Sequence, residues 1–260
     1  MNEVNKTRYI PLYGKAYVSQ KGILLRDKKA EQIWAAEGFA LKGKSRSKWL
    51  AYYMGMRAAV FDRWVSEKLE KNPHAVVLHI GCGMDSRAER VNRGGRTWYD
   101  IDFPDVIEER KRYFREEDGY RMIVGDAREE DWLEIIEGKE AIVLLEGVSM
   151  YLTPEDRQKL LERLCGRFSR VWLLMDFYTR FAAKMSKVRN PINDVGVTQV
   201  YGMDDPQEAE VPGLKFVKQH TMTPADLINQ LKGMEKAIFK KLYAGKLADK
   251  MYRLYEYERG

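Results

Sequence analysis

The sequence predicts an α/β fold with a seven-stranded, largely parallel sheet and helices on both of its faces. Two observations lead to this prediction. From residue 73 onward, short apolar runs alternate with polar segments of helix-forming composition, which is the pattern of strand–helix units in a parallel sheet. The first of these runs, residues 75–80 (AVVLHI), leads straight into Gly81-Cys82-Gly83. Open α/β sheets bind their ligands at turns of this kind.

Length, composition and charge narrow the class of protein. The chain has 260 residues, 45% of them apolar, which suits one domain with a full core and argues against disorder. Its 45 Lys and Arg against 39 Asp and Glu give a net charge of +6, so nucleic acid stays open as a partner. No apolar run is long enough to cross a bilayer, the start MNEVNKTRY does not resemble a signal peptide, and there are only two cysteines. We therefore expect a cytoplasmic protein without a membrane partner.

Residues 1–72 predict a helical cap ahead of the sheet. One helix is expected over residues 27–37 and a longer one over residues 45–69. Apolar side chains of the longer segment recur at helical spacing: Trp49, Tyr52, Tyr53, Met56, Val60, Trp64 and Leu69.

Residues 73–260 predict the core that carries the sheet. The expected parallel strands cover residues 75–80, 97–101, 122–124, 141–145 and 171–175, with helices over 105–114, 131–136 and 154–168 between them. Thr153 followed by Pro154 is a typical start for the last of these helices. The pattern lapses over residues 177–212, which we interpret as an insertion. The final strands, 214–220 and 252–258, are expected to pair with each other, the last as an antiparallel edge strand.

The glycine turn fits a ligand without phosphates better than it fits a dinucleotide. Glycine lets the backbone turn tightly and approach a ligand, and the start of the next helix offers free N–H groups. A dinucleotide fingerprint would place a third glycine at position 86, but Ser86 stands there, and Asp85 is unfavourable beside a pyrophosphate. A purely structural bend is the alternative for this turn.

Carboxylates follow the next three strands. Asp100 and Asp102 lie about 20 residues beyond the turn, where an acid that binds ribose is expected. We favour Asp102, although either acid could instead cap the next helix. Asp126, with the N–H of Ala127, could bind an adenine edge or form a local Asx turn. Together with Glu146 after the fourth strand, these acids predict an adenosine-like ligand that carries a positive centre.

The motifs GCGMDSRAERV, YDIDFPDVIEERK, GDAR and EGVSMYL resemble those of the leucine carboxyl methyltransferase family. The opening segment IPLYGKAYVSQKGILLRDKKAE resembles its bacterial branch, which includes O-methyltransferases of the tetracenomycin polyketide type. The resemblance spans residues 9–155. It implies a Rossmann-like methyltransferase sheet that binds S-adenosylmethionine. Two residues depart from the family pattern: Ala127, where a larger apolar residue is usual, and Cys82. At both positions the family uses backbone atoms, so no required side-chain group is lost.

The resemblance also implies roles for individual residues. The cofactor would lie over Gly81, Cys82 and Gly83, with its ribose on Asp102. Its adenine would meet Asp126 and Ala127, and Glu146 would lie near its sulfonium or amine. Two basic residues, Arg57 and Lys15, would hold the methionine carboxylate. The alternative interpretation of Arg57 is that it lies on a solvated helix face. No metal is implied.

The methyl acceptor is predicted only in outline. We expect O-methylation of a carboxylate or hydroxyl on a small molecule, in a pocket between the amino-terminal helices and the insertion 177–212. Candidate residues on the acceptor side are Tyr151, Asp176, Tyr178 and Tyr201. Each aromatic could instead be packing, Asp176 could cap a turn, and His79 is expected to be a core histidine rather than a base.

Other acceptors and functions stay open at this point. A protein carboxyl terminus is a possible acceptor. The basic balance leaves a nucleic-acid methyltransferase as one alternative, although lysines 236, 240, 241, 246 and 250 lie at the spacing of an ordinary amphipathic helix. A non-catalytic protein that only binds S-adenosylmethionine is the second alternative. Hydride transfer with NAD is disfavoured by Asp85 and Ser86.

Overall fold

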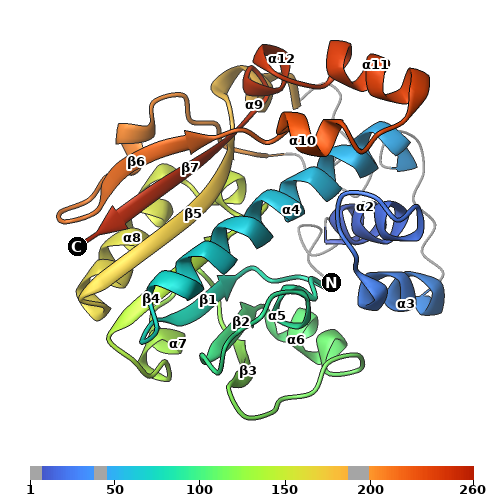
Figure 1. The fold of residues 1–260 in the computed structure, drawn as a ribbon. Helices are drawn as coiled ribbons and strands as arrows, with labels where there is room; N and C mark the ends of the chain where they lie inside the picture. Colours follow the sequence, from blue (N-terminus) through green and yellow to red (C-terminus); the bar gives the residue numbers. More distant parts are fainter. Residues whose placement is uncertain (1–7, 38–45, 187–198) are drawn as a thin grey trace.

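The computed structural model describes residues 8–37, 46–186 and 199–260. Its seven strands form one sheet in the order β3-β2-β1-β4-β5-β7-β6 (Figure 1). The strands are β1 Val76–Ile80, β2 Trp98–Asp102, β3 Tyr120–Val124, β4 Glu140–Leu145, β5 Arg170–Tyr178, β6 Lys215–His220 and β7 Tyr252–Arg259. Strands β1 to β5 are parallel, and β7 runs antiparallel to both β5 and β6. The predicted seven-stranded sheet is confirmed.

The expectation that the last strand lies at the edge was wrong. Strand β7 lies between β5 and β6, and β6 is the edge. The side chains explain the order, because Leu254, Tyr255 and Tyr257 of β7 are buried on both faces of the sheet, whereas most of β6 is half-buried or exposed. Alternation of residue types indicated a strand at 252–258, but it does not encode which strand lies beside it.

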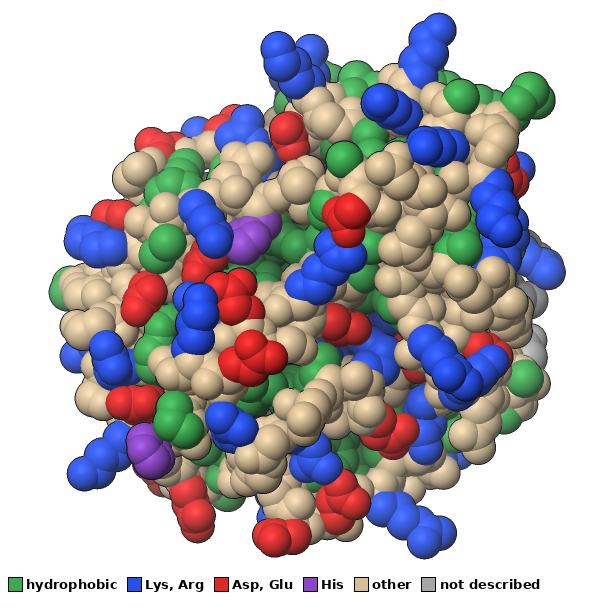
Figure 2. All heavy atoms as spheres, viewed as in Figure 1, with side chains coloured by type: hydrophobic (Ala, Val, Ile, Leu, Met, Phe, Trp, Pro, Cys, Tyr) green, Lys and Arg blue, Asp and Glu red, His purple; other side chains and the backbone are tan. Residues whose placement is uncertain are grey.

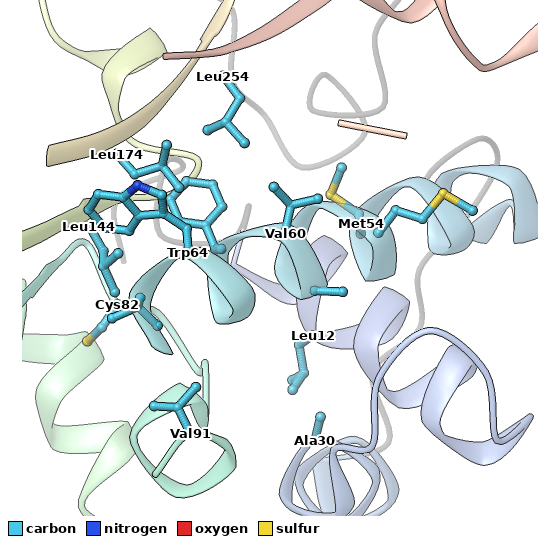
Figure 3. Close-up of a cluster of buried hydrophobic side chains, with 14 of the residues drawn as sticks. Leu12, Ala30, Met54, Val60, Trp64, Cys82, Val91, Leu144, Leu174 and Leu254 are labelled. Carbon is cyan, nitrogen blue, oxygen red and sulfur yellow. The ribbon is translucent and has the colours of Figure 1, made fainter. Parts of the chain in front are cut away.

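Helices cover both faces of the sheet, as predicted. Val77, Ile142 and Leu174 point to the face covered by α4 (Lys48–Lys71). Their neighbours in sequence point to the face covered by α7 (Asp131–Glu134) and α8 (Pro154–Arg167). Figure 3 shows Val60 and Trp64 of α4 beside Leu144, Leu174 and Leu254 of the sheet. Two apolar layers therefore enclose the sheet, and α4 is the long helix of one of them.

The described part of residues 1–72, predicted as a cap, contains α2 (Tyr9–Gln20), α3 (Lys28–Glu37) and α4. Two glycines let α2 and α4 approach closely. A Cβ at Gly14 would lie 2.6 Å from Met54 Cβ, and a Cβ at Gly55 would lie 2.8 Å from Val18 Cγ2. Because α4 also packs on the sheet, it fixes α2 at the carboxyl edge of the strands.

The segment 177–212 has more regular structure than its sequence indicated. Strand β5 continues through Phe177 to Tyr178, and α9 (Arg180–Ser186) and a short 3-10 helix, η4 (Pro206–Ala209), follow. The part of the segment at 187–198 lies outside the described residues.

The remaining helices are short except for one. They are α5 Arg87–Arg90, α6 Pro104–Arg110, η2 Ser149–Tyr151, α10 Ala225–Ile228, α11 Gly233–Leu242 and α12 Lys246–Asp249. At the start of α8, Thr153 Oγ1 accepts a hydrogen bond from Asp156 N, as its sequence predicted. None of the helices in the described ranges is long and apolar enough to span a bilayer.

Candidate functional site

A cavity of about 1070 Å³ lies at the carboxyl ends of β1 to β4 and continues between α4, α9 and the segment of α11 and α12. All the residues that we predicted to bind the cofactor line it: Lys15, Arg57, Gly81, Cys82, Gly83, Asp102, Asp126, Ala127 and Glu146. These positions lie on six separate segments of the chain. The fold thus brings the whole predicted set into one space.

The glycine turn depends on backbone conformations that favour glycine. Gly81 and Gly83 have φ angles of +69° and +50°. A Cβ at Gly81 would overlap Cγ2 of Val148, so β1 and the loop after β4 touch at this point. The N–H groups of Gly81 and Cys82 both donate to the carbonyl of Ile101 on β2. Burial raises the pKa of the Cys82 thiol well above its usual range, which keeps the thiol protonated and unreactive.

The two aspartates of β2 have different environments. Asp102 lines the cavity and accepts hydrogen bonds from the N–H groups of Gly83, at 2.7 Å, and Phe103, at 2.8 Å. Burial raises the pKa of Asp102. Asp100 does not line the cavity, and its carboxylate is bonded to four side chains: His79, Trp98, Arg110 and Tyr120. The choice of Asp102 over Asp100 therefore agrees with the geometry, and His79 is a bonded core histidine.

Arg110 of α6 is a residue next to the glycine turn that the sequence analysis did not identify. It is fully buried and ion-paired with Asp100, and its Nη1 donates to the carbonyls of Gly83, at 2.7 Å, and Asp85, at 2.9 Å. Its guanidinium thus ties the glycine turn to the buried aspartate of β2. In the sequence this arginine stands among charged residues of a predicted helix, so the local pattern does not indicate that it is buried.

Asp126 after β3 has features of both interpretations made from the sequence. It accepts hydrogen bonds from the N–H of Arg128, at 2.9 Å, and from the Arg128 guanidinium, and it lines the cavity beside Ala127. Burial alone would raise its pKa, but the hydrogen bonds from Arg128 lower it. The carboxylate is therefore ionised and held in place at the cavity wall.

A buried network of charges lies at the end of the cavity next to the glycine turn. Glu146 Oε1 lies 3.0 Å from Arg57 Nε, and its other oxygen is paired with Arg87. Asp85 is paired with Lys15, at 2.8 Å, and with Arg90, also at 2.8 Å. We call Lys15, Arg57, Asp85, Arg87 and Glu146 the ionic cluster. The sequence predicted an acidic site, but basic and acidic groups alternate here.

The arginines set the protonation states of these acids. Burial alone would raise the pKa of Glu146, but the charges of Arg87 and Arg57 lower it to about 2. In Asp85 the charges of Arg87, Arg90 and Lys15 likewise overcome burial and hold its pKa well below the usual range. Both acids are therefore ionised at neutral pH. Each can bind a positive group of a ligand without first losing a proton.

Arg57 lies on a buried part of α4, so the alternative of a solvated helix face is excluded. Besides Glu146, its guanidinium contacts the hydroxyl of Tyr252, at 2.9 Å, and Asp176 Oδ2, at 3.2 Å. Asp176 also accepts from the N–H of Gly147, at 2.7 Å, and from the Tyr252 hydroxyl, at 2.8 Å. Burial raises the pKa of Asp176 to about 6.

Two of the four residues predicted for the acceptor side line the cavity, and two do not. Tyr151 and Tyr178 line the cavity. Asp176 lies behind the cavity wall and contacts three residues that line it: Arg57, Gly147 and Tyr252. Tyr201 is absent from the lining, and its hydroxyl accepts a hydrogen bond from Gln199. The sequence missed Tyr53 and Tyr252, whose rings also line the cavity and whose role is hidden in ordinary apolar patterns.

The far half of the cavity is apolar. It is lined by aromatic, aliphatic and sulfur-containing side chains of α4, η2, α9, α11 and α12: Trp49, Leu50, Met54, Met150, Phe181, Met185, Leu242, Tyr243, Leu247 and Met251. In the described ranges, no group of three or more His, Cys, Asp and Glu residues is arranged to hold a metal ion.

Comparison with known proteins identifies the family of this chain. The family model of leucine carboxyl methyltransferase matches residues 12–165. The tetracenomycin polyketide synthesis O-methyltransferase TcmP of Streptomyces glaucescens is 35% identical over 69% of this chain and 68% of its own length. The S-adenosyl-L-methionine-dependent methyltransferase dpfgK of Gibberella zeae is 34% identical over 66% of this chain and 64% of its own. The chain thus spans about two thirds of the length of both curated relatives.

The fold has known counterparts as well. The magnesium protoporphyrin IX methyltransferase of Synechocystis, solved with bound SAH, has a TM-score of 0.53 at 12% identity, and the match covers 88% of this chain and 93% of that one. At this identity the match concerns the fold alone. The family match covers more than half of the chain, and TcmP exceeds 30% identity over two thirds of it. The chain therefore belongs to the leucine carboxyl methyltransferase family and is an S-adenosylmethionine-dependent methyltransferase.

Proposed function

We propose that this methyltransferase transfers the methyl group to a carboxylate or hydroxyl oxygen of a small molecule. The observation that carries the proposal is the continuity of the cavity. One end holds the ionic cluster and the glycine turn, and the other end is apolar. At about 1070 Å³ the cavity exceeds the roughly 300–1,000 Å³ usual for one ligand, so it has room for a cofactor and an acceptor side by side.

We propose the following contacts for the cofactor. Asp102 binds the ribose, Asp126 and the N–H of Ala127 bind the adenine, and Gly81, Cys82 and Gly83 let the backbone approach. At the methionine end, Lys15 and Arg57 bind the carboxylate, since guanidinium and ammonium groups suit it. The carboxylate of Glu146 would stabilise the positive charge of the amine or of the sulfonium. The support is that every one of these residues lines the same cavity.

We propose that three parts of the chain have different roles. Residues 1–72 act as a cap, residues 73–260 as the methyltransferase core, and residues 177–212 as an insertion on the acceptor side. Lys15 and Arg57 reach the cavity from the cap, and Tyr178 and Phe181 reach it from the insertion, which supports this division. We also propose a cytoplasmic location, because Cys82 and Cys165 are both free thiols.

The transfer itself is an in-line displacement. The acceptor oxygen would bond to the methyl carbon of S-adenosylmethionine while the bond from sulfur to that carbon breaks, and the product would be S-adenosylhomocysteine with an uncharged thioether sulfur. A carboxylate is already ionised and needs only positioning. A hydroxyl must lose its proton, and Asp176 is the carboxylate suited to receive it, through the hydroxyl of Tyr252. Tyr151 and Tyr178 would then form walls beside the acceptor.

Two other acceptors are less favoured. A nucleic acid calls for a continuous basic surface, but Figure 2 shows Lys and Arg side chains scattered among Asp and Glu on the face in view. A protein carboxyl terminus would bring polar peptide groups of its preceding residues into the apolar half of the cavity. The name of TcmP, an O-methyltransferase of polyketide synthesis, favours a small molecule.

Calorimetry and methyl-transfer assays test the proposal. S-adenosylmethionine should bind, NAD should not, and Asp102→Ala and Glu146→Ala should each weaken cofactor binding by about tenfold or more. Transfer of labelled methyl to small-molecule extracts, peptides and tRNA then identifies the acceptor class. Unchanged affinity in both variants would mean that the site is misassigned. Cofactor binding without transfer to any fraction would favour a non-catalytic role.

A further inference from the structure

The distribution of exposed apolar side chains singles out the outer end of the cavity. Ten large hydrophobic residues are exposed in the described parts of the chain. Six of these line the cavity: Phe181, Met185, Leu242, Tyr243, Leu247 and Met251. They come from α9, from the end of α11, and from the segments around α12. We call these six residues the apolar mouth.

Large apolar groups that gather in one exposed place usually mark a binding surface. Single exposed hydrophobic residues need no explanation, and Val124, Ile135, Val217 and Met234 are of that kind because none of them lines the cavity. The apolar mouth differs because its side chains border the same space as the ionic cluster. A ligand that enters there would cover them.

Helix α4 connects the two ends of the cavity. Trp49, Tyr53 and Arg57 lie four residues apart on it, so they occupy successive turns of one helix face, about 6 Å apart along the axis. Arg57 belongs to the ionic cluster. At the other end, Trp49 stacks on Tyr243 of the apolar mouth, with ring centroids 5.5 Å apart and planes 12° from parallel. The wall along α4 therefore changes from charged to aromatic within two turns.

The cations of the inner end are already engaged. Lys15 is paired with Asp85, and Arg57 with Glu146 and Asp176. Arg128 is paired with Asp126 beside the expected adenine site. The basic residue at the outer end is Lys250, which is exposed to solvent. The outer half of the cavity can therefore offer aromatic and aliphatic contacts over most of its wall.

We infer that the acceptor is a largely apolar molecule with an aromatic body, and that it enters through the apolar mouth, which sets acceptor specificity. This inference rests on the proposed function and names the class of its substrate. The reactive oxygen would point along α4 toward Arg57, and the body would lie among Trp49, Tyr243 and the mouth residues of α9 and α12. The cofactor occupies the inner end under α2.

Equilibrium dialysis with the full chain saturated with S-adenosylhomocysteine tests this inference. The probes are 2-naphthol and 2-naphthoate, which share one aromatic body, and phenol and benzoate, which present the same oxygen groups on a smaller body. Each naphthalene probe should bind at least about tenfold more tightly than its single-ring counterpart, because more apolar surface is buried. Comparing naphthol with naphthoate reports which oxygen group the site prefers.

A matched pair of variants locates the contact. Leu247→Ser removes an apolar side chain from the mouth, and Met234→Ser removes one that is more exposed but does not line the cavity. Leu247→Ser should weaken binding of 2-naphthol about threefold to tenfold, and Met234→Ser should leave it unchanged. Neither change should alter the affinity for S-adenosylhomocysteine. This second readout separates a lost acceptor contact from a loss of fold.

The outcomes for the acceptor pocket and for the cofactor site can be told apart. Equal affinities for one-ring and two-ring probes, or equal effects of the two variants, would overturn the inference even if the cofactor binds normally. Absence of binding to S-adenosylmethionine and S-adenosylhomocysteine would instead overturn the proposed cofactor site. In that case the preference for naphthalene probes, measured without cofactor, would still report on the apolar mouth.

Discussion

Lys15 and Asp85 form a buried ion pair, with 2.8 Å between Lys15 Nζ and Asp85 Oδ2. Lys15 belongs to α2 in the cap, and Asp85 follows the glycine turn of the core. The pair therefore couples the position of the amino-terminal helix to the loop that we propose lies under the cofactor.

Replacing Lys15 should weaken cofactor binding more than folding. In Lys15→Met, Asp85 keeps Arg87 and Arg90 as partners, so the fold is retained, but the carboxylate of the cofactor loses a charged donor. We expect the Kd for S-adenosylmethionine to rise at least about tenfold in calorimetry. Lys21→Met is the control, because Lys21 forms a part-exposed ion pair with Glu235 and does not line the cavity. Equal Kd values in both variants would contradict the assignment of Lys15.

Arg110→Met should destabilise the protein and loosen the glycine turn. It leaves Asp100 buried without its guanidinium partner and removes the donors to Gly83 and Asp85. Breaking such a buried pair costs about 3–5 kcal/mol, measurable as a lower midpoint in urea unfolding. Arg112→Met, which removes an exposed arginine two residues later, should cost less than about 1 kcal/mol. Similar losses in both variants would argue against a special role for Arg110.

Alanine substitutions at two glycines with similar φ angles should distinguish the cost of backbone strain from the cost of steric overlap. Gly95 has φ +77° with open space where a Cβ would lie, whereas a Cβ at Gly81, with φ +69°, would overlap Val148. Gly95→Ala should cost about 1–2 kcal/mol from backbone strain alone. Gly81→Ala should cost more and should also abolish cofactor binding. If Gly81→Ala binds the cofactor normally, the turn does not lie against it.

The rate of transfer to a hydroxyl acceptor should depend on Asp176. Its pKa is raised to about 6 by burial, opposed by Arg57 and reinforced by Glu146, and the N–H of Gly147 and the Tyr252 hydroxyl also face it. Below pH 6 the protonated acid cannot accept a proton, so kcat/KM should fall about tenfold per pH unit. Asp176→Asn should lower the rate and remove this dependence. A flat profile down to pH 5 would exclude Asp176 as the proton acceptor.

The same group should affect stability with a defined sign. Folding raises the pKa of Asp176 from 3.8 to about 6, so the folded state binds more protons between these values than the unfolded state does. Its contribution to stability is therefore fully present below pH 3.8 and is lost as the pH rises through about 6. Urea unfolding of Asp176→Asn should show a smaller decrease over this range than the parent chain.

The residues that were predicted correctly carry local signals. A buried strand followed by Gly81-Cys82-Gly83, and acids at the ends of later strands, can be read along the chain. The parallel order then brings these ends together at one edge of the sheet. Asp102 was favoured over Asp100 on the sequence, and the family resemblance implied the same residue. The two side chains lie on the same face of β2, but Asp102 is the last residue of the strand and lines the cavity, whereas Asp100 lies two residues earlier and is bonded to core side chains.

The features that were missed depend on contacts between distant segments. Arg87 and Arg110 are fully buried, yet each stands among charged residues that look like a solvated helix face. Strand β5 was ended three residues too early because Asp176 interrupts its apolar run, although its carboxylate is paired with Arg57 of α4. Local periodicity does not reveal such a partner, which lies 119 residues away in the chain.

The position of β7 between β5 and the edge strand β6 has a consequence for synthesis on the ribosome. Strand β6 hydrogen-bonds only to β7 within the sheet, and it leaves the ribosome before β7 does. Strands β1 to β5 can assemble with α4 during translation, but β6 must wait, its edge unpaired, until residues 252–259 emerge. The final step of sheet assembly is therefore the insertion of the last strand between two segments that are already made. A chain arrested before residue 252 would expose both β5 and β6 to pairing with other molecules.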